Sequence, residues 1–318
     1  MKNKETSKYP FKRGNAKKPS QKRIDKVKDR DLSSFHYMTA YATVPWNHWG
    51  FGPVMKYVFG TVVFKFFLPQ YFEKIHLLHI PVKHVDHELD EKVPFRTDRL
   101  SIYMDFVNVW IRPITMLIHR YGIWNGSKLA GEYLCYIRLA YEEAWKMYKK
   151  CFTTTYRPAS DNPKILRLRR ADPHYMCVPS LHISIVCLCF SFYRMLFERE
   201  GFTEEEKQKW NKELFSRAIE IGETVLYIKQ HSVNCIPAAL YMLTRITPEF
   251  FTPEQATEFI DALFVNANNV SEENKKRIHS HINFMYERLL LEGTMEDDWT
   301  VPVMRWLENY EPHTPSYE

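Results

Sequence analysis

Three groups of polar residues, in a fixed order along the chain, have side-chain types that phosphoryl transfer can use. They are Lys150 with Arg157, then the tetrad from Pro179 to His182, then His231. A phosphoryl group in transfer carries charge on its oxygens, so fixed cations and N–H donors stabilise it. Of two histidines, one can attack phosphorus while the other protonates the leaving oxygen. This chemistry requires no metal and no cofactor.

Ser180 and His182 stand at the start of the most apolar run of the chain. The segment from Pro173 to Tyr193 has no Asp, Glu, Lys or Arg, but it holds two prolines, two histidines and three serines. We therefore expect a buried core helix here rather than a membrane span. The start of such a helix offers backbone amides and a positive dipole end to an anion. A bound phosphate ester thus explains a histidine at the mouth of an apolar helix.

This ordered set of motifs resembles the type 2 phosphatidic acid phosphatase superfamily. The family signature is K-x6-RP, then PSGH, then SR-x5-H-x3-D, and the resemblance covers residues 145–245. The spellings PSLH and KQH are most similar to the branch of lipid phosphatases and inositol phosphorylceramide synthases. The resemblance implies a phosphohistidine at His231, a general acid at His182, and phosphate-binding roles for Lys150, Arg157 and Ser180.

Three positions depart from this signature. Leu181 replaces its glycine, Val225 its arginine and Cys235 its final aspartate. In the family that aspartate accepts the N–H of the attacking imidazole, whereas a thiol is a poor acceptor. We therefore expect Asn234, together with Cys235, to orient His231.

The departures leave two functions open. The first is a metal-independent, acid-phosphatase-type hydrolase or phosphotransferase that acts on a phosphate ester, lipid esters included. Its missing cation would come from Lys229 or from one of Arg167, Arg169 and Arg170. The second is a catalytically degenerate helical scaffold or binding protein of the same fold. A vanadium haloperoxidase has a similar anion site, but it needs a richer shell of cations.

A second polar group consists of His76, His79, His84, Asp86 and His87. Its spacing matches no standard zinc site, and Pro81 would interrupt any helix through it. We expect a loop with scattered histidines and no metal.

The composition predicts packed helices. The chain has 318 residues, of which 45% are hydrophobic, 15% are aromatic and only 10 are glycine. Few glycines and many bulky side chains favour helices over sandwiches and barrels. We predict one all-α domain over residues 31–318, a helix bundle with an irregular, aromatic-rich N-terminal third. Helix starts are expected at Thr203 and Thr252, and a helix from Ser271 to Glu292.

Prolines and a basic leader set further expectations. We expect Pro113 to break the helix that follows Asp98, and Pro237 to end or kink the second most apolar segment. Residues 1–30 hold 12 Lys or Arg against 3 Asp or Glu, and this composition predicts a disordered leader.

The leader also bears on localisation. The six cysteines form no CxxC pair, and the charged first thirty residues are not expected to be a signal peptide. We therefore expect reduced thiols in a cytoplasmic protein. The leader is expected to bind an anionic membrane surface rather than a specific nucleic acid. The aromatic stretch Val54–Phe72, with its interleaved lysines, is expected to help. This peripheral binding should be sensitive to salt and should be lost when residues 1–30 are deleted.

Overall fold

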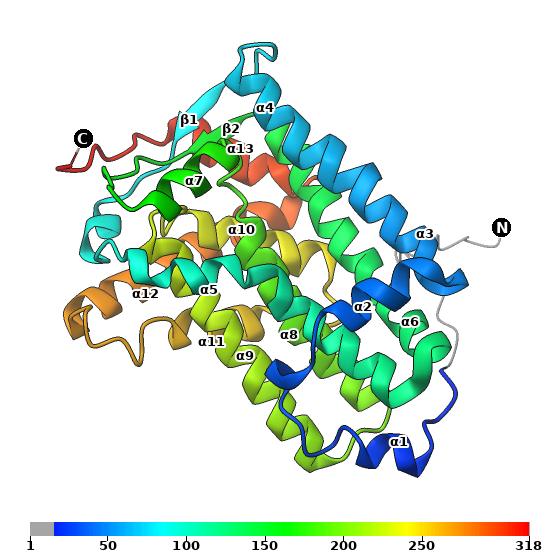
Figure 1. Ribbon diagram of the computed structural model, residues 1–318. Helices are drawn as coiled ribbons and strands as arrows, with labels where there is room; N and C mark the ends of the chain where they lie inside the picture. The colour runs from blue at the N-terminus through cyan, green and yellow to red at the C-terminus, as the bar shows by residue number, and fades with distance from the viewer. Residues whose placement is uncertain (1–15, 318) are drawn as a thin grey trace.

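The computed structural model describes residues 16–317, and they are mostly helical. The predicted all-α class is confirmed. The α-helices are α1 (Gln21–Asp25), α2 (Met38–Thr43), α3 (His48–Tyr57), α4 (Leu68–Lys74), α5 (Leu100–Met104), α6 (Phe106–Tyr148), α7 (Pro163–Ala171), α8 (Leu181–Arg199), α9 (Glu204–Tyr227), α10 (Cys235–Ile246), α11 (Pro253–Ala262), α12 (Glu272–Glu292) and α13 (Thr300–Asn309). A π-helix, Val58–Phe67, joins α3 to α4. Figure 1 shows these helices packed around α8 and α10.

Two short strands tie together the loops at one end of the bundle. β1 (Val82–His84) and β2 (Phe152–Thr154) pair in parallel, with Val82 opposite Phe152. Thr153 of β2 also bridges to Met176 in the loop before α8. The strands therefore connect the segment after α4 with the two loops that carry Arg157 and Ser180.

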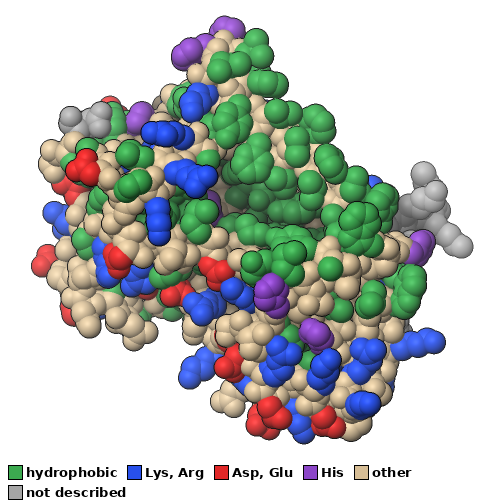
Figure 2. All heavy atoms as spheres, viewed as in Figure 1, with side chains coloured by type: hydrophobic (Ala, Val, Ile, Leu, Met, Phe, Trp, Pro, Cys, Tyr) green, Lys and Arg blue, Asp and Glu red, His purple; other side chains and the backbone are tan. Residues whose placement is uncertain are grey.

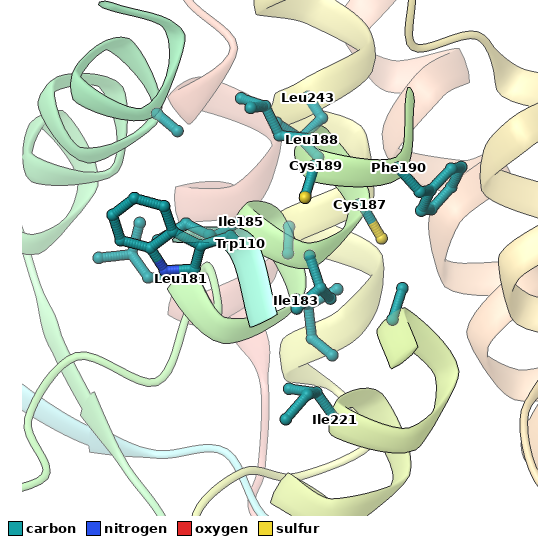
Figure 3. Close-up of a cluster of buried hydrophobic side chains, with 14 of the residues drawn as sticks. Trp110, Leu181, Ile183, Ile185, Cys187, Leu188, Cys189, Phe190, Ile221 and Leu243 are labelled. Atoms are coloured by element: carbon teal, nitrogen blue, oxygen red, sulfur yellow. The ribbon is translucent and has the colours of Figure 1, made fainter. Parts of the chain in front are cut away.

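The helix α8 is the centre of the hydrophobic core. It contacts α6, α9 and α10, and most of its side chains are buried. Figure 3 shows its apolar side chains near Trp110 of α6 and Ile221 of α9. Because α8 is apolar on nearly all sides, it has little solvent-facing surface. Its packing therefore fixes the position of His182, which lies in the first turn of α8.

Three predicted helix boundaries are confirmed. Thr203 and Thr252 cap α9 and α11, each in a reciprocal capping box with the side chain three residues on. Ser271 caps α12, and Gly293 follows the last residue of that helix. These boundaries depend on local side-chain hydrogen bonds, which a short stretch of sequence determines.

The long helix α6 bends at a glycine rather than at a proline. Pro113 lies within the helix, so the predicted break there is wrong. The chain turns instead at Gly122, whose φ of 81° is accessible to glycine at little cost. Just after the turn, a Cβ on Gly126 would lie 2.6 Å from the Ile118 Cα. The two glycines thus allow the two halves of α6 to meet closely.

The break between α9 and α10 also falls away from its predicted proline. α9 ends at Tyr227 and α10 begins at Cys235. Pro237 lies in the first turn of α10, where an absent N–H leaves no helical bond unmade. The prediction that Pro237 ends or kinks a helix is therefore wrong. The chain turns at residues 228–234 instead, and His231 lies in this turn.

The N-terminal third is irregular, as expected, with short helices and loops before residue 48 and after residue 74. Between them, His48–Lys74 is one continuous helical segment. Residues 16–30, expected to be part of the disordered leader, include α1, and Val27 is fully buried. The expectation of disorder is therefore wrong for residues 16–30. Residues 1–15 lie outside the described residues.

Candidate functional site

The structure brings Ser180, His182 and His231 together at the N-terminal end of α8. Both Ser180 Oγ and His182 Nδ1 lie 3.2 Å from His231 Nε2. The centroids of the two imidazoles are 5.3 Å apart. Ser180 is the N-cap of α8, and its hydroxyl accepts a hydrogen bond from the Ile183 amide. The three side chains therefore converge at the positive end of a buried helix.

Buried hydrogen bonds fix the loop that leads into α8. The Tyr148 hydroxyl, at the end of α6, donates to the Pro179 carbonyl at 2.5 Å. The Ser180 amide donates to the Cys235 carbonyl at 3.4 Å. The loop is thus attached both to α6 and to the start of α10, which holds Ser180 beside the turn that carries His231.

The two histidines face one small cavity. Its lining residues are Phe66, Gln70, Asp172, His174, Met176, Cys177, Leu181, His182, Gln230 and His231. Its volume is ≈ 20 Å³, which is room for about one water molecule. Leu181, which replaces the glycine of the phosphatase signature, is buried at its edge. A phosphate ester therefore enters only when the lining side chains move apart.

Burial keeps both histidines neutral. It lowers the pKa of His182 to about 4. It also lowers the pKa of His231 well below the usual value, and the neighbouring His182 lowers it further. Neutral imidazole is the form that can act as a nucleophile, whereas a general acid must carry a proton. A bound anion favours the charged form of a nearby histidine, so binding and protonation are coupled in this site.

The two predicted phosphate-binding cations lie in different surroundings, and neither lines the cavity itself. Arg157 is close to it: after burial, the Arg157 charge is the largest cause that lowers the pKa of His174. Lys150 instead donates to Asp298 at 3.2 Å and to Thr300 Oγ1 at 2.5 Å. The structure thus places Arg157 beside the site and Lys150 in an ion pair near the start of α13.

Several buried polar atoms around the cavity have no hydrogen-bond partner within residues 16–317. They are His231 Nδ1, both polar side-chain atoms of Gln230 and one guanidinium nitrogen of Arg157. An unpaired buried polar group costs about 1–3 kcal/mol, so a cluster of them is typical of a site that binds a polar ligand. Because the cluster includes a guanidinium and amide donors, the ligand that suits it is an anion.

The predicted orienting residues do not contact His231. The Asn234 side chain bonds to the Val85 carbonyl, the Tyr310 hydroxyl and His281 Nε2. The Cys235 thiol accepts a hydrogen bond from a backbone amide of its own turn. The physical reason is that residues 231–235 form a turn, so a spacing of four does not place two side chains on one helical face.

Two of the proposed replacement cations have distinct positions. The Lys229 ammonium donates to two backbone carbonyls, those of Asp90 and Val93. Arg169 donates to the Pro158 carbonyl at 2.8 Å. Burial lowers the pKa of Arg169, and the charge of Arg157 lowers it further. Arg169 is therefore the replacement cation that lies near Arg157.

His174 and Gln230 line the cavity but are absent from the predicted site. His174 Nε2 lies 2.8 Å from Thr155 Oγ1, and its ring centroid is 6.5 Å from that of His231. Its φ of 70° is uncommon for a residue other than glycine. Gln230 directly precedes His231, and this adjacency is the sequence signal that could have identified it.

The histidines between residues 76 and 87 have separate surroundings. His84 Nδ1 lies 3.3 Å from Asp86 Oδ2, and the His87 ring stacks on His281 at 3.9 Å. Within the described part of the chain, no group of three or more His, Cys, Asp or Glu side chains could hold a metal ion.

Comparison with known proteins gives this chain no relatives. No family model, no curated protein and no solved structure matches it significantly.

Proposed function

We propose that this protein is a metal-independent phosphatase or phosphotransferase that forms a phosphohistidine at His231. The observation that supports this most strongly is the convergence of His182 Nδ1 and Ser180 Oγ on His231 Nε2, each at 3.2 Å. Gln230, whose side-chain polar atoms have no partner within residues 16–317, lines the same cavity, and Arg157 lies close to His174 on its wall. This set of groups can bind an anion, attack it and protonate its leaving group.

In the first half of the reaction, the lone pair of His231 Nε2 attacks phosphorus. The bond between phosphorus and the ester oxygen breaks, and protonated His182 gives its proton to that oxygen. In the second half, neutral His182 takes a proton from a water or from an acceptor alcohol, whose oxygen attacks phosphorus. The P–N bond then breaks, and both histidines return to their starting forms. Arg157, Gln230 and the amides at the start of α8 stabilise the equatorial oxygens.

The anion itself supplies the condition for protonating His182. At a separation of about 4 Å and an effective dielectric constant of about 20, two unit charges interact by about 4 kcal/mol. This energy corresponds to about three pKa units. A phosphate that enters the cavity would therefore raise the pKa of His182 from about 4 to the neutral range, where a general acid is most effective.

The test is release of p-nitrophenol from p-nitrophenyl phosphate by the purified full-length chain in EDTA. We expect turnover that vanadate inhibits, because vanadate takes the geometry of the phosphoryl group in transfer. His231→Ala should lower turnover by at least about 10³-fold, because it removes the nucleophile. His76→Ala, an exposed loop histidine, is the matched control and should retain wild-type turnover. An activity that requires added metal would contradict the proposal.

Two observations favour the second candidate, a catalytically degenerate scaffold. The cavity has room for about one water molecule, and Lys150 is engaged by Asp298. The two candidates differ in anion binding. A scaffold with a permanently closed cavity should ignore millimolar sulfate or vanadate, whereas the enzyme should order either anion between Arg157, Ser180 and His231 in a crystal.

A further inference from the structure

The outer face of the segment His48–Lys74 exposes six aromatic side chains. They are Phe51, Phe59, Phe64, Phe67, Tyr71 and Phe72, each between 37% and 61% exposed. We name this face the apolar ridge. Figure 2 shows apolar side chains along the edge that α3 and α4 occupy in Figure 1, next to an apolar hollow. A contiguous apolar patch of this kind marks an interaction surface.

A second helix shows that protein packing does not account for the ridge. By length and composition, two described helical segments could cross a membrane, His48–Lys74 and Leu181–Arg199. In the most apolar stretch of α8, 78% of the residues are buried inside the protein. In the most apolar stretch of His48–Lys74, only 6% are buried. The apolar character of α8 thus serves the core, whereas that of the ridge has no partner within the described residues.

The charges along the ridge are of one sign. Its exposed charged residues are Lys56 and Lys74, and its single acidic residue, Glu73, is buried. The Tyr71 hydroxyl donates to the Ala171 carbonyl at 2.6 Å, which fixes the end of α7 beside α4. α7 exposes three more cations there, Lys164, Arg167 and Arg170. An apolar strip with a cationic margin complements a bilayer with anionic headgroups.

We infer that the apolar ridge is a membrane-binding surface that takes an anionic bilayer. The segment lies along the membrane plane rather than across it, because its inner face packs on α6 and cannot be surrounded by lipid. Trp46, which is 80% exposed two residues before α3, and Tyr71 near the end of α4 suit the headgroup region. In a dimer formed through the ridge, the lysines and arginines of one copy would lie close to those of the other copy. Their repulsion would oppose association.

The test is flotation of the full-length chain with vesicles of phosphatidylcholine alone and with 30 mol% phosphatidylglycerol added. We expect the wild-type chain to float with the anionic vesicles and to bind them less at high salt. The double variant Phe59→Asp with Phe64→Asp should bind at least about tenfold more weakly, because two apolar contacts are replaced by repelled charges. Phe284→Asp is the matched control, since Phe284 is 62% exposed on α12 and should bind like the wild type.

Circular dichroism and the thermal midpoint verify that each variant is folded. Quenching of tryptophan fluorescence by brominated lipid supplies a second measure of contact, and it should fall in the double variant alone. Wild-type protein that stays with neither vesicle overturns the inference. So does a dimer, detected by light scattering, that the ridge variant dissociates while vesicles are ignored. Because the vesicles contain no added substrate, and turnover of a soluble ester is measured separately, this inference and the proposed phosphatase fail independently.

Discussion

Anion binding at the histidine pair should take up a proton, and this coupling can be measured. Burial lowers the pKa of His182 to about 4, so this side chain is neutral between pH 5 and pH 8. One unit of negative charge bound about 4 Å away would raise the pKa by about three units, to about 7. Between these two pKa values binding takes up one proton. The affinity for a dianion should therefore rise as the pH falls, by up to about tenfold per unit.

Sulfate is the appropriate probe, because it stays a dianion throughout this range. Isothermal titration at pH 7 and pH 5 should show that sulfate binds roughly 50-fold more tightly at the lower pH. At pH 5, titration in two buffers of different ionisation enthalpy should report uptake of close to one proton. His182→Gln should remove most of this pH dependence, whereas the loop variant His76→Gln should keep it.

Two results would refute this reasoning. Equal affinity at pH 5 and pH 7 would show that the anion does not interact with a buried neutral histidine. A pH dependence that persists unchanged in His182→Gln would assign the proton to another group. Complete absence of sulfate binding at either pH would contradict the anion site itself and favour the scaffold.

Two other predictions concern charged residues. Arg157→Gln should weaken sulfate binding by about 10- to 100-fold, the value of a charge-assisted hydrogen bond, whereas Lys150→Gln should change it less than about twofold, because Lys150 already pairs with Asp298. Equal effects of the two variants in calorimetry would mean that Lys150 reaches the anion. Glu206→Gln should lower the free energy of unfolding by about 3–5 kcal/mol, because Glu206 and Arg120 form a pair in which both side chains are 4% exposed. Urea denaturation measures this, and a loss below about 1 kcal/mol would show that the pair is dispensable.

Local patterns identified the fold class and several helix ends, because the forces involved act over a few residues. The capping boxes at Thr203 and Thr252 depend on side chains three positions apart. The bend in α6 does not: Gly122 and Gly126 were needed because two halves of a helix pack together, and no local rule distinguishes them from other glycines. The prolines at 113 and 237 were wrongly predicted to interrupt helices. Each lies inside a helix that tertiary packing stabilises.

The candidate site shows the same division. The order of the motifs was sufficient to predict that His182 and His231 act together, and the structure places both at one cavity although 49 residues separate them. The surroundings of Lys150 were beyond such reasoning, because its partner Asp298 lies 148 residues away. The turn at residues 228–234 also changed the roles expected for Asn234, since the prediction assumed a helix there. The sequence motifs thus indicated which residues lie at the site, whereas long-range packing determined the hydrogen-bond partners of each.

The position of α8 within the chain has a consequence for synthesis. α8 is as apolar as a membrane span, and two of the helices that cover it, α9 and α10, follow it in sequence. A ribosome that has completed Arg199 must continue to Ile246 before both covers exist, which takes roughly 2–10 s at 5–20 residues per second. During this interval the nascent chain presents an uncovered segment that chaperones or a translocation machinery would bind. The order of helices therefore leaves α8 uncovered for part of translation, although the finished fold buries most of its side chains.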